Sequence, residues 1–180
     1  MNIYIALLRG INVSGKNKIK MTELKQLCLD IGFSEITTYI QSGNVIFSTQ
    51  EINTSKIENK LVTAVKNKFG HSIKVLVLKK KELETVFKSN PFINEANFDF
   101  KKTCATFLDK TPTEEGIEKV RALAAKDELL IFKNKTVYIY CPDGFGRTKL
   151  SNSNIENKLK VSATSRNWNT VTKLVELSNQ

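Results

Sequence analysis

The predicted secondary-structure elements of this chain follow the same order twice, and this repetition constrains the fold more than any other feature. Short apolar runs predict strands, and apolar residues spaced three and four apart, such as Leu24, Leu27 and Ile31, predict helices. The first half gives strand, helix, strand, strand, helix and strand at residues 3–8, 21–31, 36–40, 43–48, 54–69 and 73–78. The second half gives the same order at residues 103–108, 113–125, 128–132, 136–141, 152–160 and 161–164.

This β-α-β-β-α-β order is that of a ferredoxin-like unit, also called an α/β-plait. We therefore expect an α+β protein with two tandem ferredoxin-like subdomains, at residues 1–79 and 103–180. A helix over 80–88 and a loop form the linking segment 80–102, and a C-terminal helix over 168–178 closes the second subdomain. The two halves share the order of elements, without similarity between their residues.

Apolar residues occupy both faces of the predicted strands. In the first strand Ile5 and Leu7 alternate with Ala6 and Leu8. A sheet with helices on one side ordinarily has a polar opposite face. We therefore expect both faces to be covered, by the other subdomain or by a second copy of the chain in a homodimer.

The charge of the chain favours anionic partners. Lys and Arg number 28 and Asp and Glu number 18, which gives a formal net charge of +10. This excess suits an anionic small molecule or nucleic acid, although a solvated lysine-rich surface has the same composition.

The apolar and cysteine content indicates the cellular environment to expect for the protein. No segment approaches the roughly 18 apolar residues of a membrane span, so no membrane partner is expected. The three scattered cysteines, Cys28, Cys104 and Cys141, are typical of a reducing compartment, and we expect a cytoplasmic protein. Since the chain has one histidine, a metal site of His and Cys ligands is not expected, and no cofactor is predicted.

A basic loop over residues 9–20 follows the first predicted strand. It contains Gly10 and Gly15 and four positive charges, and glycine lets a backbone approach a ligand closely. The loop is one residue from a phosphate-binding P-loop, because Asn17 stands where Ser or Thr would hold magnesium. The next helix is expected to begin near Met21, too late for its N-terminus to meet that phosphate. Two interpretations remain, a looser anion-binding loop and a structural turn.

Ferredoxin-like topology places the end of the first strand and the turn between the second and third strands at one edge of the sheet. We therefore expect the loop over 9–20 to lie near residues 41–44 and predict a ligand site there. Its members would supply charge, hydroxyl and amide groups, and they are Arg9, Asn12, Lys16, Gln41, Ser42 and Asn44. The alternative is that Asn12, Ser42 and Asn44 only satisfy backbone groups of turns.

A second candidate cluster lies in the segments 144–149 and 164–169, which the same topology brings to one edge of the second sheet. The candidate ligands are Arg147, Lys149, Arg166 and Asn167. Two arginines can clamp a carboxylate or phosphate, or each can pair with local acids and carbonyls. Trp168 continues an apolar helical stripe and is expected to anchor the last helix.

Specific catalytic chemistry is not indicated by any arrangement of residues. Ser42 and Ser165 lack a nucleophile elbow, and His71 is distant from both in the sequence. Residues 3–8 resemble the first-strand motif of RNA-recognition domains, but the third strand lacks the companion aromatics. Base stacking is therefore not expected, and Tyr4 is assigned to the core.

Three segments together resemble a bacterial family called domain of unknown function 1697. They are residues 6–13 (ALLRGINV), 21–24 (MTEL) and 38–47 (TYIQSGNVIF), and residues 163–174 resemble the C-terminal signature of that family. The resemblance implies two α/β-plait subdomains and no particular activity. The sequence departs from the family pattern at Ser14, where glycine is common, and at Lys20, where proline is frequent.

From these features we expect a protein that binds an anionic ligand, including the alternative of nucleic acid, through its basic glycine-containing loops. One further interpretation is an enzyme that acts on a phosphorylated or nucleotide-like small molecule, with Arg9, Lys16, Arg147 and Arg166 stabilising charge. Another is a homodimeric interaction module.

Overall fold

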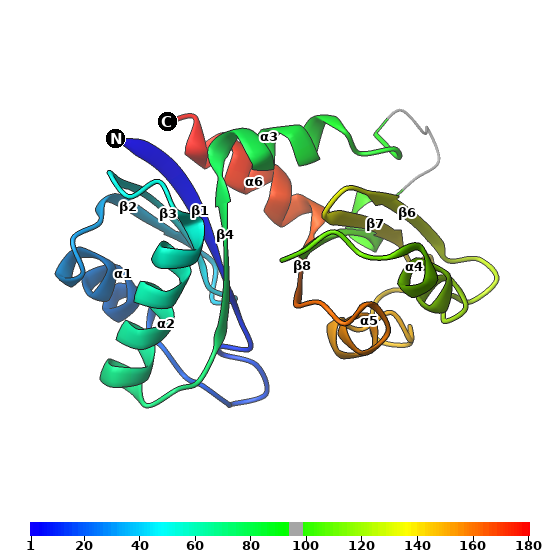
Figure 1. Ribbon diagram of the computed structural model, residues 1–180, viewed down its shortest axis with the longest axis horizontal. Coiled ribbons are helices and arrows are strands. Elements are labelled where there is room, and N and C mark those ends of the chain that lie inside the picture. The colour runs from blue at the N-terminus through cyan, green and yellow to red at the C-terminus, as the bar shows by residue number, and fades with distance from the viewer. Residues whose placement is uncertain (94–98) are drawn as a thin grey trace. The chain divides into compact units, whose positions relative to one another are not determined.

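The computed structural model describes residues 1–93 and 99–180, which form six α-helices and two four-stranded antiparallel sheets (Figure 1). The predicted mixed α+β class is therefore confirmed. The chain divides into two compact units, the first comprising Met1–Thr85 with Lys173–Gln180 and the second comprising Val86–Thr172. The predicted boundaries were 79 and 103, with all of 103–180 in the second subdomain. Part of the predicted linker, residues 94–98, lies outside the described residues.

The first sheet has β1 near its centre. Its strand order is β2-β3-β1-β4, and all neighbouring strands are antiparallel. Leu7 lies opposite Asn44 of β3, and Tyr4 lies opposite Lys79 of β4. The end of β1 therefore lies beside the start of β3 at one end of the strands, and the start of β1 lies beside the end of β4 at the opposite end. The strands are β1 (Asn2–Arg9), β2 (Ser34–Tyr39), β3 (Asn44–Thr49) and β4 (Lys74–Lys79).

Two helices, α1 (Met21–Asp30) and α2 (Thr54–Phe69), cover one face of this sheet (Figure 1). Ala6 and Leu8 of β1 share a buried core with Leu24 of α1 and with Leu61 and Val65 of α2. The ends of α2 follow from local chemistry. The Asn53 side chain accepts a hydrogen bond from the Lys56 amide, and Gly70 ends the helix in the left-handed conformation with φ 74°.

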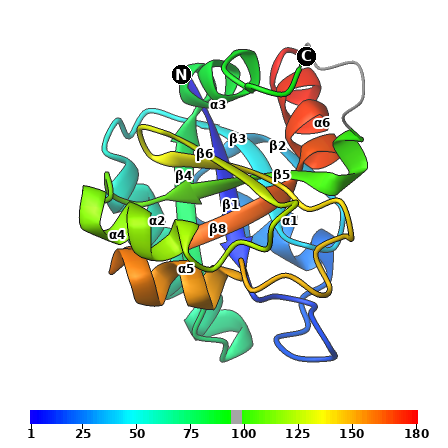
Figure 2. The same ribbon diagram turned by 90° about the vertical axis from the view of Figure 1, so that its right-hand side faces the viewer.

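The second unit repeats this order of elements. Its sheet has the strand order β6-β7-β5-β8, with antiparallel neighbours throughout. The strands are β5 (Thr103–Leu108), β6 (Leu129–Lys133), β7 (Thr136–Tyr140) and β8 (Ala163–Asn167). The helices α4 (Glu114–Arg121) and α5 (Asn152–Leu159) lie side by side (Figures 1 and 2). Val120, Ile155 and Leu159 from these helices pack with Val137 and Ile139 of β7.

Two further helices are α3 (Lys80–Lys88), which begins directly after β4, and α6 (Trp168–Ser178), which begins directly after β8; a short 3-10 helix, η1 (Phe100–Lys102), precedes β5. The Trp168 ring is buried and stacks on Phe87, with ring centroids 5.7 Å apart. It also lies 6.2 Å from the Tyr138 ring. The predicted role of Trp168 as an anchor of the last helix is confirmed.

Two element boundaries in the second unit were predicted wrongly. The fourth helix ends at Arg121 rather than residue 125, because Leu123 and Ala124 donate to carbonyls only three residues back and so form turns. The last strand spans Ala163–Asn167 rather than 161–164, because α5 ends at Lys160 with φ 57° and the Ser162 amide donates to the Asp109 carboxylate before the strand begins. The polar sequence of β8 hid its extent, since a strand is recognised by its apolar residues.

Residues on both faces of the central strands are buried, whereas the edge strands β2 and β6 include exposed residues. Ile5 and Ala6, which are neighbours in β1 and lie on opposite faces, are both fully buried. Tyr138 and Ile139 of β7 are each 1% exposed.

Replacement of Gly43 tests the packing between the β2–β3 turn and the segment after β1. Its φ is +78°, and an added Cβ would lie 2.6 Å from Ile11 Cδ1 and 2.8 Å from Leu8 Cβ. We expect Gly43→Ala to lower the free energy of unfolding by about 2–4 kcal/mol, since left-handed strain and overpacking add together. Gly10 is a matched control, because it has φ +74° but nothing within 4 Å of an added Cβ. Gly10→Ala should cost only about 1–2 kcal/mol in urea unfolding. Equal losses for the two variants would contradict close packing at Gly43.

Candidate functional site

The β1–α1 loop, residues 10–20, is a compact hairpin rather than an open P-loop. Its tip is closed by a 2.9 Å hydrogen bond from the Lys16 amide to the Val13 carbonyl. Ser14 and Gly15, which lie between Val13 and Lys16, have φ values of 48° and 75°, as the central residues of type I′ turns do. Ser14, where the sequence departs from the family pattern, therefore has a left-handed backbone conformation that glycine adopts with less strain.

The Asn12 side chain holds this loop in place. Its amide nitrogen donates to the carbonyls of Ile19 and Gln41, both at 2.9 Å. Its amide oxygen accepts a 2.9 Å hydrogen bond from the Ile19 amide. Asn12 has a φ of 54°, a conformation that asparagine tolerates better than most residues. One side chain thus joins the start of the loop, the end of the loop and the β2–β3 turn.

The β2–β3 turn lies against the same edge of the sheet. The Leu8 amide donates to the Gly43 carbonyl at 2.8 Å. The Asn44 side chain is fully buried and donates to the Tyr39 carbonyl and the Ser42 hydroxyl, both at 3.0 Å. The predicted proximity of the loop over 9–20 to residues 41–44 is therefore confirmed.

These contacts separate the predicted residues of the first cluster into two groups. Asn12 and Asn44 satisfy backbone groups, as the structural alternative required, and Ser42 accepts from Asn44. Arg9 is half-buried at the end of β1, whereas Lys16 and Gln41 are exposed. The polar groups available to a ligand therefore lie beside Asn12 rather than on it.

A cavity of about 560 Å³ adjoins the loop at the point where α1 begins. Its lining joins the end of the loop, the first turn of α1 and the β2–β3 turn, through Asn12, Lys18, Ile19, Lys20, Met21, Thr22, Glu23 and Gln41. We call this the β1–α1 cavity. Of the residues predicted to bind a ligand, Asn12 and Gln41 line it, and Lys18, Lys20 and the start of α1 were missed.

The start of α1 gives the β1–α1 cavity positive potential. Lys20 occupies the N-cap position with extended backbone (φ −71°, ψ 137°) and makes no capping hydrogen bond. Lysine has no acceptor, so it cannot satisfy the first amides of the helix, which lack intrahelical partners. The helix dipole and the exposed Lys18 and Lys20 therefore act in the same direction. Glu23, in the first turn, is the one carboxylate among the lining residues.

The comparison with a P-loop missed the proximity of the loop to the start of α1, because it considered only the spacing of residues along the sequence. α1 begins at Met21, four residues after Asn17, as predicted. The hairpin folds the intervening residues back, and the Asn12–Ile19 hydrogen bonds bring the start of the loop to the start of the helix. The sequence signal was the pair Lys18 and Lys20 directly before a helix without a capping residue.

The second predicted cluster does not form an exposed clamp. Arg147 and Lys149 are exposed in the segment between β7 and α5. Arg166 is a buried strand residue that donates to the Ser165 carbonyl at 3.0 Å, and burial lowers its pKa to about 10. The Asn167 side chain donates to the Lys101 carbonyl and accepts from the Asn169 amide. Arg166 and Asn167 were expected in a loop but lie in β8, and this position explains why their side chains form hydrogen bonds to backbone carbonyls of the protein.

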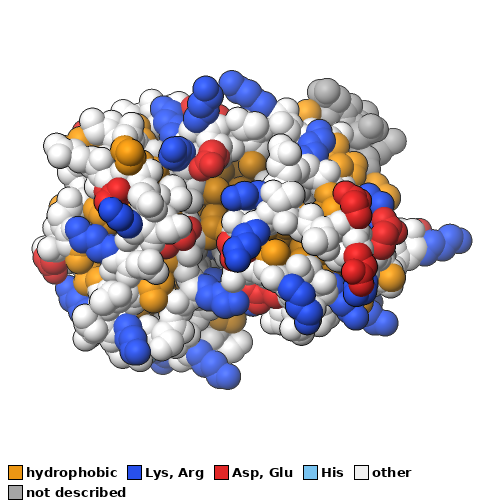
Figure 3. All heavy atoms as spheres, in the orientation of Figure 1, with side chains coloured by type: hydrophobic (Ala, Val, Ile, Leu, Met, Phe, Trp, Pro, Cys, Tyr) orange, Lys and Arg blue, Asp and Glu red, His pale blue; other side chains and the backbone are white. Residues whose placement is uncertain are grey.

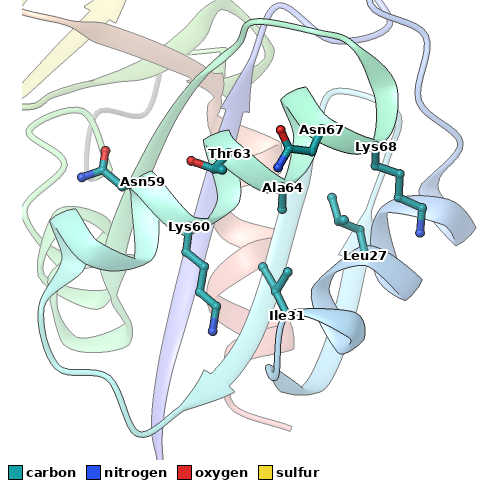
Figure 4. A pocket seen from close by; sticks show the side chains of 8 residues that line it. All are labelled: Leu27, Ile31, Asn59, Lys60, Thr63, Ala64, Asn67 and Lys68. Atoms are coloured by element: carbon teal, nitrogen blue, oxygen red, sulfur yellow. The ribbon is translucent and has the colours of Figure 1, made fainter.

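A larger cavity, of about 660 Å³, lies between α1 and α2 (Figure 4). Leu27 and Ile31 of α1 and Ala64 of α2 form its apolar part. Its two lysines already have partners, since Lys68 pairs with Asp30 at 3.2 Å and Lys60 Nζ lies 5.5 Å from the centre of the Phe33 ring. This groove therefore has less capacity for an anion than the β1–α1 cavity.

The cysteines are poor nucleophiles. Burial raises the pKa of the Cys28 and Cys104 thiols to about 12 and that of Cys141 to about 11, so all three are protonated at neutral pH. Over residues 1–93 and 99–180, no three His, Cys, Asp or Glu side chains are grouped so that they could hold a metal ion. Within the same residues, none of the helices has the length and apolar character needed to cross a membrane.

Replacement of Asn12 tests its role in holding the loop. Asn12→Ala leaves two carbonyls and one amide without their partner, and we expect the free energy of unfolding to fall by about 1–3 kcal/mol. Ser14→Gly, at the exposed tip, should leave stability unchanged or slightly raised, because glycine relieves the left-handed conformation. Urea unfolding followed by circular dichroism compares the two. If the Asn12→Ala variant is as stable as the natural protein, Asn12 does not hold the loop, and a role in ligand binding would account for it better.

Comparisons with other proteins agree with this fold. In structure the chain is similar to the conserved bacterial protein SP0830 from Streptococcus pneumoniae, with a TM-score of 0.77 and 24% sequence identity over 98% of each chain. No curated protein matches the chain. The model of a family described as a protein of unknown function, DUF1697, matches residues 1–138, and the resemblance at 163–174 lies beyond them. Since the match covers more than half of the sequence, the chain belongs to the DUF1697 family.

Proposed function

We propose that this protein binds a small anionic ligand in the β1–α1 cavity. The observation that carries the proposal is the start of α1, where the N-cap residue Lys20 makes no capping hydrogen bond and lines one cavity together with Lys18. Helix N-termini bind phosphate and carboxylate groups through backbone amides and the helix dipole. A basic N-cap residue leaves those amides without an internal acceptor.

The size of the β1–α1 cavity favours a small molecule. Its volume of about 560 Å³ lies within the roughly 300–1,000 Å³ of ligand sites. The amides of Thr22 and Glu23 and the two lysines would bind the anionic group, and Gln41 would contact the remainder. Arg9 and Lys16 would raise the potential around the entrance, while Asn12, Ser42 and Asn44 hold the loop and turn in position.

Nucleic acid fits the face shown in Figure 3 less well. Tyr4, the aromatic residue of β1, belongs to the core beneath α1 and α2 and offers no stacking surface. On the face in Figure 3 the lysine and arginine side chains are scattered, and acidic side chains gather over α4, which carries Glu114, Glu115 and Glu118. A polyanion would favour a continuous basic stripe.

The finer description of the fold is part of the proposal. We propose that each unit is a ferredoxin-like subdomain, supported by the order β2-β3-β1-β4 and its counterpart β6-β7-β5-β8. We also propose that the protein acts in the cytoplasm, because Cys28, Cys104 and Cys141 are buried free thiols.

The combined variant Lys18→Gln/Lys20→Gln tests the proposal. Calorimetric titration with inorganic pyrophosphate should show saturable binding that weakens about five- to twentyfold in this variant, equivalent to ~1–2 kcal/mol. Lys66→Gln is the matched control, because Lys66 is exposed on α2 and lies outside the β1–α1 cavity. It should bind pyrophosphate as the natural protein does. An equal loss in both variants would indicate non-specific attraction to net charge.

Glu23 gives a test in the opposite direction. Its carboxylate repels an anion at the start of α1, so Glu23→Gln should tighten pyrophosphate binding about two- to fivefold. The same calorimetric titration measures this change. Weaker binding in Glu23→Gln would place the anion elsewhere.

Salt dependence separates small ligands from nucleic acid. Fluorescence polarisation with a mixed-sequence single-stranded DNA at several salt concentrations gives the number of phosphates neutralised. The proposal expects weak binding to DNA that pyrophosphate does not displace. Tight DNA binding with a steep salt slope, and none to pyrophosphate, would establish nucleic acid as the ligand.

A further inference from the structure

The edge strands of the two sheets differ in how far they are protected from pairing with another strand. They are β2 and β4 in the first sheet and β6 and β8 in the second. An open edge exposes backbone amides and carbonyls that can pair with another extended chain, and proteins commonly block such edges. In β2 the pairing with β3 is irregular between Ser34 and Thr37, and Glu35 has a φ of 50°. An irregularity of this kind twists an edge away from further pairing.

The edges of β4 and β8 are blocked by carboxylates in the same way. Glu58 of α2 accepts a 2.9 Å hydrogen bond from the Val77 amide of β4. Glu156 of α5 accepts a 2.9 Å hydrogen bond from the Ala163 amide of β8. In each unit the helix that precedes the edge strand thus supplies a glutamate to it. An amide that donates to such a carboxylate is not available to an added strand.

Within residues 1–93 and 99–180, β6 (Leu129–Lys133) has neither form of protection, and its register with β7 is regular. Lys133 lies opposite Thr136 across a two-residue turn, so these residues bond to each other and the bonded positions alternate from there. Leu130 and Phe132 therefore direct their amides and carbonyls away from β7. No other group in the described ranges forms a hydrogen bond with these amides or carbonyls.

The side chains of β6 suit contact with another strand. Leu129 is 42% exposed and Ile131 is half-buried. The charged residue of the strand, Lys133, stands at its end, where its Nζ donates to the Ser89 carbonyl at 2.8 Å. A regular edge with apolar side chains and open backbone groups is the arrangement that accepts an added strand.

The charges at the two ends of β6 indicate which strand fits it. Asp127 and Glu128 directly precede β6, with Lys126 one residue farther out, whereas Lys133 and Lys135 lie at its other end. Antiparallel pairing of two copies places the acidic start of each strand beside the basic end of the other. Parallel pairing would place like charges together. A second copy of this chain in antiparallel orientation therefore complements β6.

We propose that β6 pairs with β6 of a second copy in a two-fold symmetric dimer, so that the second sheet continues from one copy to the other. The outward groups of Leu130 bond to those of Phe132 in the other copy, and the reverse pair forms by symmetry. This register places Ile131 opposite its own equivalent and Leu129 opposite Lys133. The contact is small, so we expect a dissociation constant on the order of 100 µM. The dimer does not depend on an anion in the β1–α1 cavity.

Sedimentation equilibrium of the full-length protein tests the self-association. The proposal predicts a monomer–dimer equilibrium in which the dimer fraction rises with protein concentration. A protein that remains monomeric at concentrations well above the expected dissociation constant would overturn the proposal.

Leu129 gives the decisive comparison, because the register places it opposite Lys133. Leu129→Glu should dimerise about five- to twentyfold more tightly than Leu129→Lys, since the new charge faces a lysine twice in the symmetric dimer. Leu29 of α1 is the matched control, because it is 45% exposed and its two variants change the net charge equally. Leu29→Glu and Leu29→Lys should differ by less than about twofold. Equal differences at the two positions would show a general charge effect and overturn the proposal.

Cross-linking tests the register. Ile131→Cys places two thiols opposite each other, where the Cα atoms of a pair without mutual hydrogen bonds are roughly 4.5 Å apart, a separation that a disulfide can span. Diamide, which takes up the two electrons and two protons that the thiols release, should convert this variant to a covalent dimer. Leu29→Cys should remain monomeric, as should the natural protein, whose cysteines Cys28, Cys104 and Cys141 are buried. No cross-link in Ile131→Cys, or an equal one in Leu29→Cys, would overturn the proposed pairing.

Discussion

The hydrogen bonds of the Asn12 side chain are the interaction on which the architecture of the candidate site depends. They join Ile19, at the end of the β1–α1 loop, to Gln41, in the β2–β3 turn. They act together with the buried side chains of Ile11 and Ile19, which anchor the same loop in the core. Because the loop is held, Lys18 and Lys20 lie beside the first turn of α1, and their charges add to its dipole.

The sequence predicted the elements well where local patterns were strong. The helix over 54–69 was predicted with its observed bounds from the spacing of Leu61, Val65 and Phe69 and from the closing Gly70, and the structure adds the Asn53 cap at its start. The strand over 103–108 was also predicted correctly, since all of its residues are buried. The prediction failed at β8, where Thr164, Ser165, Arg166 and Asn167 are polar and pairing with β5 decides the conformation.

The candidate site was predicted in part. Strand order alone placed the β1–α1 loop beside residues 41–44, and hydrogen bonds between them bear this out. The roles within the site did not follow from the sequence, because an asparagine that binds a ligand and one that satisfies a turn have the same side chain. Only the three-dimensional contacts show that the Asn12 and Asn44 side chains bond to backbone carbonyls and that Lys20 makes no capping hydrogen bond at the start of α1.

A crystal structure of the protein grown with inorganic pyrophosphate tests the central claim most directly, namely that the start of α1 binds an anion. The account predicts a phosphoryl group within hydrogen-bond distance of the Thr22 and Glu23 amides, with Lys18 or Lys20 in contact with it. Pyrophosphate bound away from α1, or absent at concentrations that saturate binding in solution, would contradict the account.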